Sequence, residues 1–102
     1  MKVIVRPQFY TDVSEEVEWL LEIAGAEVAK RWHDALWQTV QFLKTHPKIG
    51  RERQDLNRSG VRSWRVNHFT RWLIFYGVRQ GTLIVYRVRS GTMNLVVLEL
   101  ES

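Results

Sequence analysis

The stretch TRWLIFYGVRQGTLIVYRV, residues 70–88, predicts two β-strands joined by a tight turn. β-Branched and aromatic residues fill both of its ends, while Gln80 and Gly81 near its middle have the composition of a hairpin turn. If these two are the central turn residues, Arg79 pairs with Thr82 and the same antiparallel register continues along both strands. The stretch therefore predicts the centre of a β-sheet.

This register divides the hairpin into two faces, because successive side chains of a strand point to opposite sides. One face is mostly apolar and suits packing under helices; it would hold Arg71, Leu73, Phe75, Gly77, Ile84, Tyr86 and Val88. The other mixes apolar and guanidinium groups and would stay uncovered; it would hold Trp72, Ile74, Tyr76, Val78, Leu83, Val85, Arg87 and Arg89. A change of one residue in the turn length would exchange the two faces.

A further strand is predicted by VRSWRV, residues 61–66, just before the hairpin. Trp64 and Val66 would face the helices, whereas Ser63 and Arg65 would join the uncovered face. Together with the hairpin, this strand predicts an antiparallel meander in the second half of the chain.

The first half begins with the strand-like run KVIV, residues 2–5, which ends near Pro7. Asp12 then precedes an apolar stripe of helical spacing, and Glu15 stands three residues later, as in a capping box. We therefore expect a first helix that starts at Asp12 and breaks or kinks at Gly25.

A second apolar stripe of helical spacing runs over residues 28–43 and must end before Pro47. Two consecutive amphipathic helices with a short break predict a helical hairpin. The predicted class is α+β, with the N-terminal strand and the helical hairpin packed on one face of an antiparallel sheet. Residues 94–100 are a candidate for one more strand, and the whole of residues 1–102 is expected to form a single domain.

The charge is unevenly distributed along the chain. The formal net charge is +4, residues 12–27 hold six acidic and no basic residues, and residues 51–89 hold nine arginines against two acidic residues. This asymmetry favours an acidic partner or substrate for the second half, although a solvated basic face without a partner is also compatible with it. The absence of cysteine excludes disulfides and thiolate metal sites, and no segment predicts a signal peptide or membrane span, so a cytoplasmic location is expected.

Arginine and aromatic side chains share the face predicted to be uncovered. Arg65, Arg87 and Arg89 would lie there beside Trp72 and Tyr76. Guanidinium groups next to aromatic rings suit RNA, phosphate, carboxylate or an acidic peptide equally well. The pattern predicts a binding surface without naming its ligand.

The three histidines predict neither a metal site nor a cofactor. His33, His46 and His68 show no ligand spacing with one another or with carboxylates. His68 falls in the turn VNHFT near arginines and would be the one candidate general base.

Three more residues have two interpretations each. Arg62 would point to the same face of the sheet as Trp64. It would either contact a ligand or bind its strand to the preceding loop. Trp19 and Trp37 lie outside the main apolar stripes of their helices. They would either widen the core or form part of a partner-binding surface.

The order of short motifs in the second half resembles RelE/ParE-superfamily toxins, and most closely the ParE branch. The motifs are Pro47 with Gly50, Leu56, Gly60-Val61-Arg62-Ser63, Leu73-Ile74-Phe75-Tyr76, and Val85-Tyr86-Arg87-Val88 with Gly91. The first half has a similar layout of one strand, an acidic helix and a longer helix, so the resemblance covers nearly the whole chain.

The resemblance implies the toxin of a type II toxin–antitoxin pair, of the plasmid-stabilisation kind, bound and neutralised by a ParD-like or similar antitoxin in a hetero-oligomer. ParE-like members are associated with inhibition of DNA gyrase and have no known hydrolytic site. The alternative is a RelE-like, ribosome-dependent, metal-independent mRNA endoribonuclease, in which Arg65, His68 and Arg87 would work. A third alternative is an inactive member that only binds the antitoxin, since residues 90–94, SGTMN, keep only the glycine and asparagine of the usual ParE segment.

Overall fold

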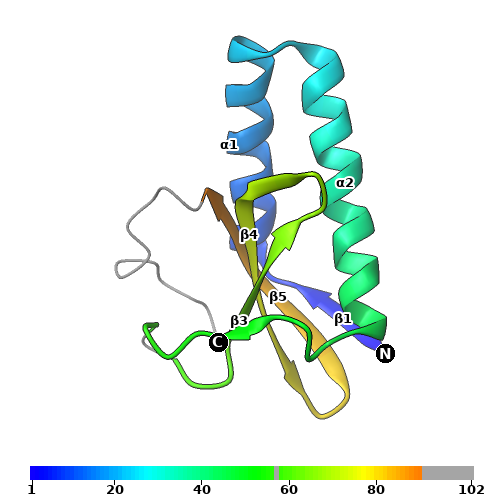
Figure 1. Cartoon of the computed structure of the whole chain (residues 1–102), viewed down its shortest axis with the longest axis vertical. Helices are drawn as coiled ribbons and strands as arrows, with labels where there is room; N and C mark the ends of the chain where they lie inside the picture. Colours follow the sequence, from blue (N-terminus) through cyan, green and yellow to red (C-terminus); the bar gives the residue numbers. More distant parts are fainter. Residues whose placement is uncertain (57, 91–102) are drawn as a thin grey trace.

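The computed structural model describes residues 1–56 and 58–90, as one strand, two helices and four further strands (Figure 1). The elements are β1 (Lys2–Val5), α1 (Pro7–Ile23), α2 (Ala26–Thr45), β2 (Arg51–Glu52), β3 (Arg62–Val66), β4 (Phe69–Arg79) and β5 (Thr82–Ser90). The two helices form a hairpin that packs on one face of the sheet (Figure 1). The predicted α+β class is confirmed. No helix in these described ranges combines the length and apolarity needed to cross a membrane.

The sheet has five strands in the order β1-β5-β4-β3-β2. Neighbouring strands from β2 to β5 are antiparallel, whereas β1 runs parallel to β5, with Lys2 opposite Thr82 and Val5 opposite Val85. The sheet is therefore mixed. The antiparallel meander predicted for the second half is confirmed, whereas β1, expected to pack on one face of this sheet, joins it as a parallel edge strand. A parallel pair needs a long connection, which here includes the helical hairpin.

Helix α1 begins at Pro7, five residues earlier than predicted. Proline suits the first helical position because its fixed φ is helical and its missing N–H has no partner there in any case. Arg6 is the N-cap and makes no side-chain capping bond, so the predicted capping box of Asp12 and Glu15 does not exist. The predicted break at Gly25 is confirmed, with φ of 94°.

Helix α2 ends where the sequence predicts. Thr45 is its last residue, and the N–H of His46 donates to the carbonyl of Phe42 just before Pro47. The strand suggested for residues 94–100 lies outside the described part of the chain.

The turn between β4 and β5 is also as predicted. Gln80 and Gly81 both have positive φ, of 51° and 73°, which is the backbone of a tight hairpin turn. Arg79 lies opposite Thr82, which confirms the register next to the turn.

Farther from the turn, a β-bulge changes the register. Tyr76 pairs with Val85, but the preceding residue, Phe75, pairs with Arg87, so Tyr86 is an additional residue in β5. Beyond the bulge, Leu73 lies opposite Arg89, in place of the predicted pairing of Trp72 with Arg89.

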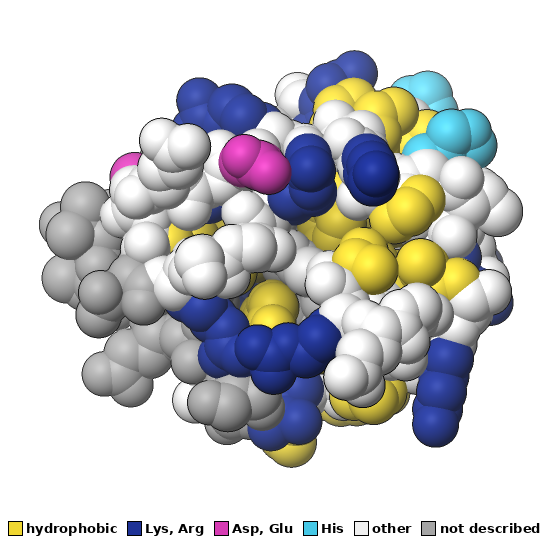
Figure 2. All heavy atoms as spheres, turned by 90° about the horizontal axis from the view of Figure 1, so that it is seen from below, with side chains coloured by type: hydrophobic (Ala, Val, Ile, Leu, Met, Phe, Trp, Pro, Cys, Tyr) yellow, Lys and Arg dark blue, Asp and Glu magenta, His cyan; other side chains and the backbone are white. Residues whose placement is uncertain are grey.

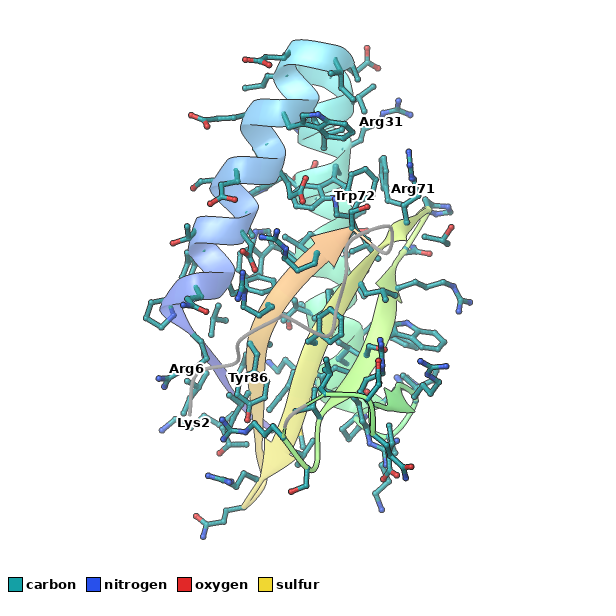
Figure 3. All side chains as sticks on the ribbon, turned by 90° about the vertical axis from the view of Figure 1, so that its left-hand side faces the viewer. Lys2, Arg6, Arg31, Arg71, Trp72 and Tyr86 are labelled. Atoms are coloured by element: carbon teal, nitrogen blue, oxygen red, sulfur yellow. The ribbon has the colours of Figure 1, made fainter. Side chains whose placement is uncertain are left out.

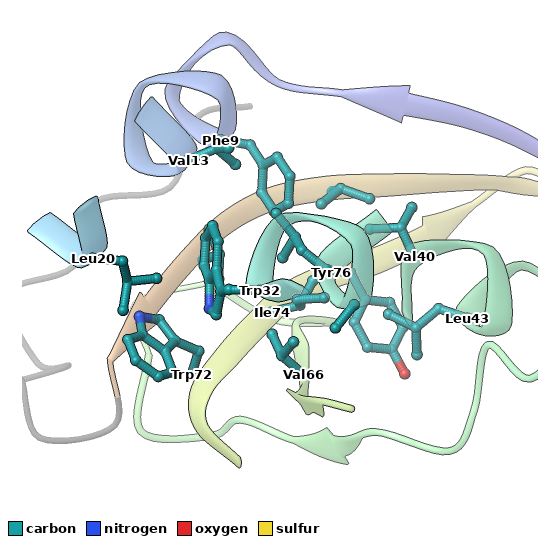
Figure 4. Close-up of a cluster of buried hydrophobic side chains, with 14 of the residues drawn as sticks. Phe9, Val13, Leu20, Trp32, Val40, Leu43, Val66, Trp72, Ile74 and Tyr76 are labelled. Atoms are coloured by element: carbon teal, nitrogen blue, oxygen red, sulfur yellow. The ribbon is translucent and has the colours of Figure 1, made fainter. Parts of the chain in front are cut away.

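The main core lies between the helices and the sheet (Figure 4). From the sheet it receives Trp72, Ile74, Tyr76, Leu83, Val85 and Val88, together with Val66 and the half-buried Trp64. Trp64 and Val66 therefore face the helices as predicted. Val88 also packs under the helices, as predicted. The other faces predicted for the hairpin were wrong: the residues of the face predicted to be uncovered, except Arg87, Arg89 and the exposed Val78, pack under the helices.

A second, smaller core covers part of the opposite face. Leu56 and Val61 pack there against Phe75 and Tyr86. Because the loop before β3 supplies this cover, both faces of the hairpin are apolar, which explains why their sequence could not indicate the helix side.

Candidate functional site

The carboxylate of Asp12 is the centre of a buried ion-pair network at the edge of β5. Strand β1 covers that edge only as far as Val85, and Asp12 on α1 occupies the next stretch. Its oxygens accept hydrogen bonds from Nε and Nη2 of Arg87 at 2.7 and 2.9 Å and from Nη1 of Arg89 at 3.1 Å. The backbone N–H of Val88 donates to the same carboxylate at 3.2 Å.

Two guanidinium groups therefore converge on one carboxylate that is 2% exposed. Gln8 also accepts a hydrogen bond from Nη1 of Arg87 at 3.1 Å. The sequence analysis assigned Arg87 and Arg89 to an uncovered binding face. In the structure, both form ion pairs with Asp12 of the same chain. The sequence analysis missed Asp12 as their partner because it assigned that residue to a helix cap.

Trp72 and Tyr76 are buried on the helix side, so the structure does not bring them together with Arg87 and Arg89 as one exposed surface. Tyr76 instead anchors a loop: its hydroxyl donates to the carbonyl of Pro47 at 2.8 Å and accepts from the N–H of Gly50 at 2.9 Å. Burial raises the pKa of this phenol above its ordinary value of 10.0.

Arg62 and Arg53 both tie the loop around β2 to the sheet. Arg62 donates to the carbonyl of Gly50 at 2.7 Å, in agreement with the structural alternative for this residue. Arg53, which the sequence analysis did not single out, is buried, and its guanidinium donates twice to Asp55 and lies 5.4 Å from the Phe75 ring centroid. The Arg53 hydrogen bonds lower the pKa of Asp55 to about 2.

Arg65 is exposed and occupies a different place from Arg87. Its guanidinium lies 4.4 Å from the ring centroid of Trp64. Both residues line a pocket of about 240 Å³ between β3 and α2, with Gln38, Thr39, Phe42 and Asn67.

A second pocket, of about 260 Å³, lies between α1 and the end of β4. Its lining residues are Glu16, Trp19, Arg71, Trp72 and Ser90. Figure 3 shows Trp72 and Arg71 side by side at that end of the sheet. Burial raises the pKa of the Glu16 carboxyl above its ordinary value of 4.5, and the nearby indole N–H of Trp72 offsets this only in part. That N–H approaches the carboxylate without completing a hydrogen bond of ordinary geometry.

The two other tryptophan candidates differ in exposure. Trp19 is 44% exposed, whereas Trp37 is half-buried, packs edge-on against Phe9 and donates to Nε2 of His33 at 3.1 Å. Trp37 therefore contributes to packing between the helices, and Trp19 remains available to a partner.

Arg65, His68 and Arg87, the three residues of the ribonuclease alternative, do not converge on one site. His68 is exposed in the β3–β4 turn with φ of 65°, Arg65 lies over Trp64, and Arg87 is held by Asp12. Within residues 1–56 and 58–90, no three His, Asp or Glu side chains form a group suited to a metal ion.

Basic side chains dominate one end of the molecule. Figure 2 views the end that carries the β4–β5 turn, where Lys and Arg side chains surround small hydrophobic patches and acidic side chains are sparse. This distribution agrees with the excess of arginine in the second half of the sequence.

Comparisons with known proteins found similarity to one sequence family and to a solved structure. The sequence model for the ParE toxin of the type II toxin–antitoxin system, parDE, matches residues 3–95. A solved structure described as the chromosomal ParDE TA system from P. aeruginosa has a TM-score of 0.74 and 16% sequence identity, and covers 88% of this chain and 95% of its own. At this identity the likeness shows the fold alone. No curated protein has a sequence that matches this chain.

Proposed function

This chain belongs to the ParE toxin family of type II toxin–antitoxin systems, and on that premise we propose that it arrests growth by acting on DNA gyrase. A cognate antitoxin, ParD-like or similar, binds the toxin in a hetero-oligomer and neutralises it. Because this target and this antitoxin are bacterial cytoplasmic proteins, the proposed location of the toxin is the bacterial cytoplasm. The proposed activity needs no cofactor.

The ion pairs of Arg87 and Arg89 with the buried carboxylate of Asp12 are the main observation that supports a non-hydrolytic action. Metal-free cleavage of RNA needs a proton acceptor, a proton donor and cations that converge on one phosphate. Arg87 is turned toward α1, so it does not join Arg65 and His68 around a common point. This arrangement favours a toxin that acts by binding over a ribonuclease.

The surface of the chain supports an acidic antitoxin. The net charge is +4, and the exposed aromatic side chains include Trp19 on α1 and Phe42 on α2. A segment that carries carboxylates and apolar side chains would complement both properties. Antitoxin segments of this composition are commonly disordered until they bind.

Induction of the chain in bacteria tests this function if transcripts and chromosomal DNA breaks are measured together. We expect growth arrest with DNA breaks, an SOS response and intact transcripts, and rescue by the protein encoded in the adjacent gene. Ribosome-dependent transcript cleavage that is lost in Arg65→Ala would instead assign the RelE-like activity. Binding to the antitoxin without any growth arrest would identify an inactive family member.

A further inference from the structure

The outer edge of β3 is only half covered by its neighbour. Strand β2 pairs with Arg62 and Ser63 alone, and no described residue continues this pairing beside Trp64, Arg65 and Val66. The carbonyl of Val61 accepts from the N–H of Arg53 on the β2 side. Because backbone groups alternate along an antiparallel strand, those of Arg65 point to the same side, where a further strand would pair.

The pocket between β3 and α2 opens beside this edge. Its aromatic wall is formed by Phe42, which is 38% exposed, and Trp64, whose ring centroid lies 6.5 Å from that of Phe42 in a stacked arrangement. The hydroxyl of Thr39 accepts a hydrogen bond from the N–H of Asn67 at 3.0 Å, so the end of β3 is tied to α2. The pocket is therefore preformed between two fixed elements.

The charge at this edge is unbalanced. No acidic residue lines the pocket, and Arg65 has no carboxylate within ion-pair distance among the residues that the structure describes. Arg53, Arg62, Arg87 and Arg89, in contrast, each pair with a carboxylate of the chain itself. Arg65 is thus available to an external acidic group.

We propose that the outer edge of β3 and the adjoining pocket bind an extended segment of the antitoxin. The segment adds a strand beside Trp64 and Arg65, inserts an apolar side chain next to Phe42 and places a carboxylate on Arg65. The identity of this partner rests on the proposed function. Nucleic acid fits less well, because it cannot continue the backbone pairing of a sheet edge. A second copy fits less well too, since antiparallel edge pairing about Arg65 would bring two like charges together.

The test uses the full chain and the protein encoded beside it. Dissociation constants are measured for wild type, Arg65→Glu, Arg65→Gln and the control Arg79→Glu, an exposed arginine that carries the same charge reversal at the β4–β5 turn. We expect Arg65→Glu to weaken binding roughly 10- to 100-fold and Arg65→Gln to weaken it less, with Arg79→Glu within about twofold of wild type. Hydrogen exchange should show that complex formation protects the amide of Arg65. Thermal unfolding of each free variant confirms that it is folded.

Three results would overturn the proposal. If both Arg65 variants bind as wild type does and the Arg65 amide still exchanges in the complex, the antitoxin uses another surface, although neutralisation itself stands. If wild type forms no complex at all, the proposed function fails and this site fails with it. If the free chain forms a dimer that Arg65→Glu dissociates, the edge belongs to a second copy.

Discussion

The carboxylate of Asp12 and the guanidinium of Arg87 form a two-point ion pair that joins α1 to β5 across 75 residues of sequence. The same carboxylate accepts the N–H of Val88, so it also completes the backbone hydrogen bonding of β5 beyond the end of β1. The pair therefore stabilises the junction between the helical hairpin and the sheet. Its arginine belongs to the sequence motif that carries the family resemblance.

Replacing Asp12 by alanine should lower the free energy of unfolding by about 3–5 kcal/mol, because two largely buried guanidinium groups lose their shared carboxylate. Urea denaturation of the free toxin measures this loss. The matched control is Glu15→Ala, since Glu15 is exposed and its carboxylate is 4.0 Å from Arg89; its effect should stay below about 1 kcal/mol. Equal effects of the two variants would show that the buried network does not stabilise the fold.

Replacing Tyr76 by phenylalanine should lower the free energy of unfolding by about 1–3 kcal/mol. The change leaves the N–H of Gly50 and the carbonyl of Pro47 without their hydrogen-bond partner. Hydrogen exchange should become faster at Gly50, while the ring continues to fill the core. Tyr10→Phe serves as control because Tyr10 is exposed and should change stability by less than about 0.5 kcal/mol. Unchanged exchange at Gly50 in Tyr76→Phe would contradict the proposed anchoring role.

Local signals in the sequence predict much of this fold. The turn at Gln80 and Gly81, the break at Gly25 and the end of α2 before Pro47 are each determined by the backbone preferences of a few neighbouring residues. The start of α1 was mispredicted because Pro7 was taken as the end of a strand, although proline is also favoured as the first residue of a helix.

The candidate site was harder to predict, because its geometry depends on contacts between distant residues. The bulge at Tyr86 has no local signal in the sequence. It nevertheless places the side chain of Arg87 on the opposite face of the sheet from the buried Val85, and it returns Val88 to the main core. The ion pair of Asp12 with Arg87 depends on where β1 ends beside β5, which no pattern within α1 indicates.

Replacing Asp55 by asparagine should make the protein less sensitive to acid. The pKa of Asp55 is lowered from 3.8 to about 2 by its hydrogen bonds with Arg53, so the pair stabilises the fold above pH 3.8 and loses its effect as the pH falls through about 2. The stability difference between wild type and Asp55→Asn should therefore narrow over this range. Because Asp55 is 46% exposed, we expect a difference below about 1 kcal/mol at pH 7.

Urea denaturation between pH 2 and pH 7 measures this narrowing, with 1 M salt as the control. Salt at that concentration shortens the Debye length to about 3 Å and should reduce the difference at pH 7. A difference that is independent of both pH and salt would mean that asparagine changes the loop through its backbone preferences and not through charge.

Replacing Trp19 by alanine should weaken the antitoxin complex by about 2 kcal/mol if this exposed ring is a binding hot spot, with little loss of fold stability. Trp19 is 44% exposed, and its ring centroid lies 6.3 Å from that of Trp72 in a tilted arrangement. Trp37→Ala is the comparison, since Trp37 packs against Phe9 and should cost about 2–4 kcal/mol of folding free energy. Calorimetric titration with the antitoxin and urea denaturation separate the two effects. The prediction is contradicted if Trp19→Ala loses as much stability as Trp37→Ala and still binds the antitoxin normally once folded. Trp19 would then belong to the core and would have no part in antitoxin binding.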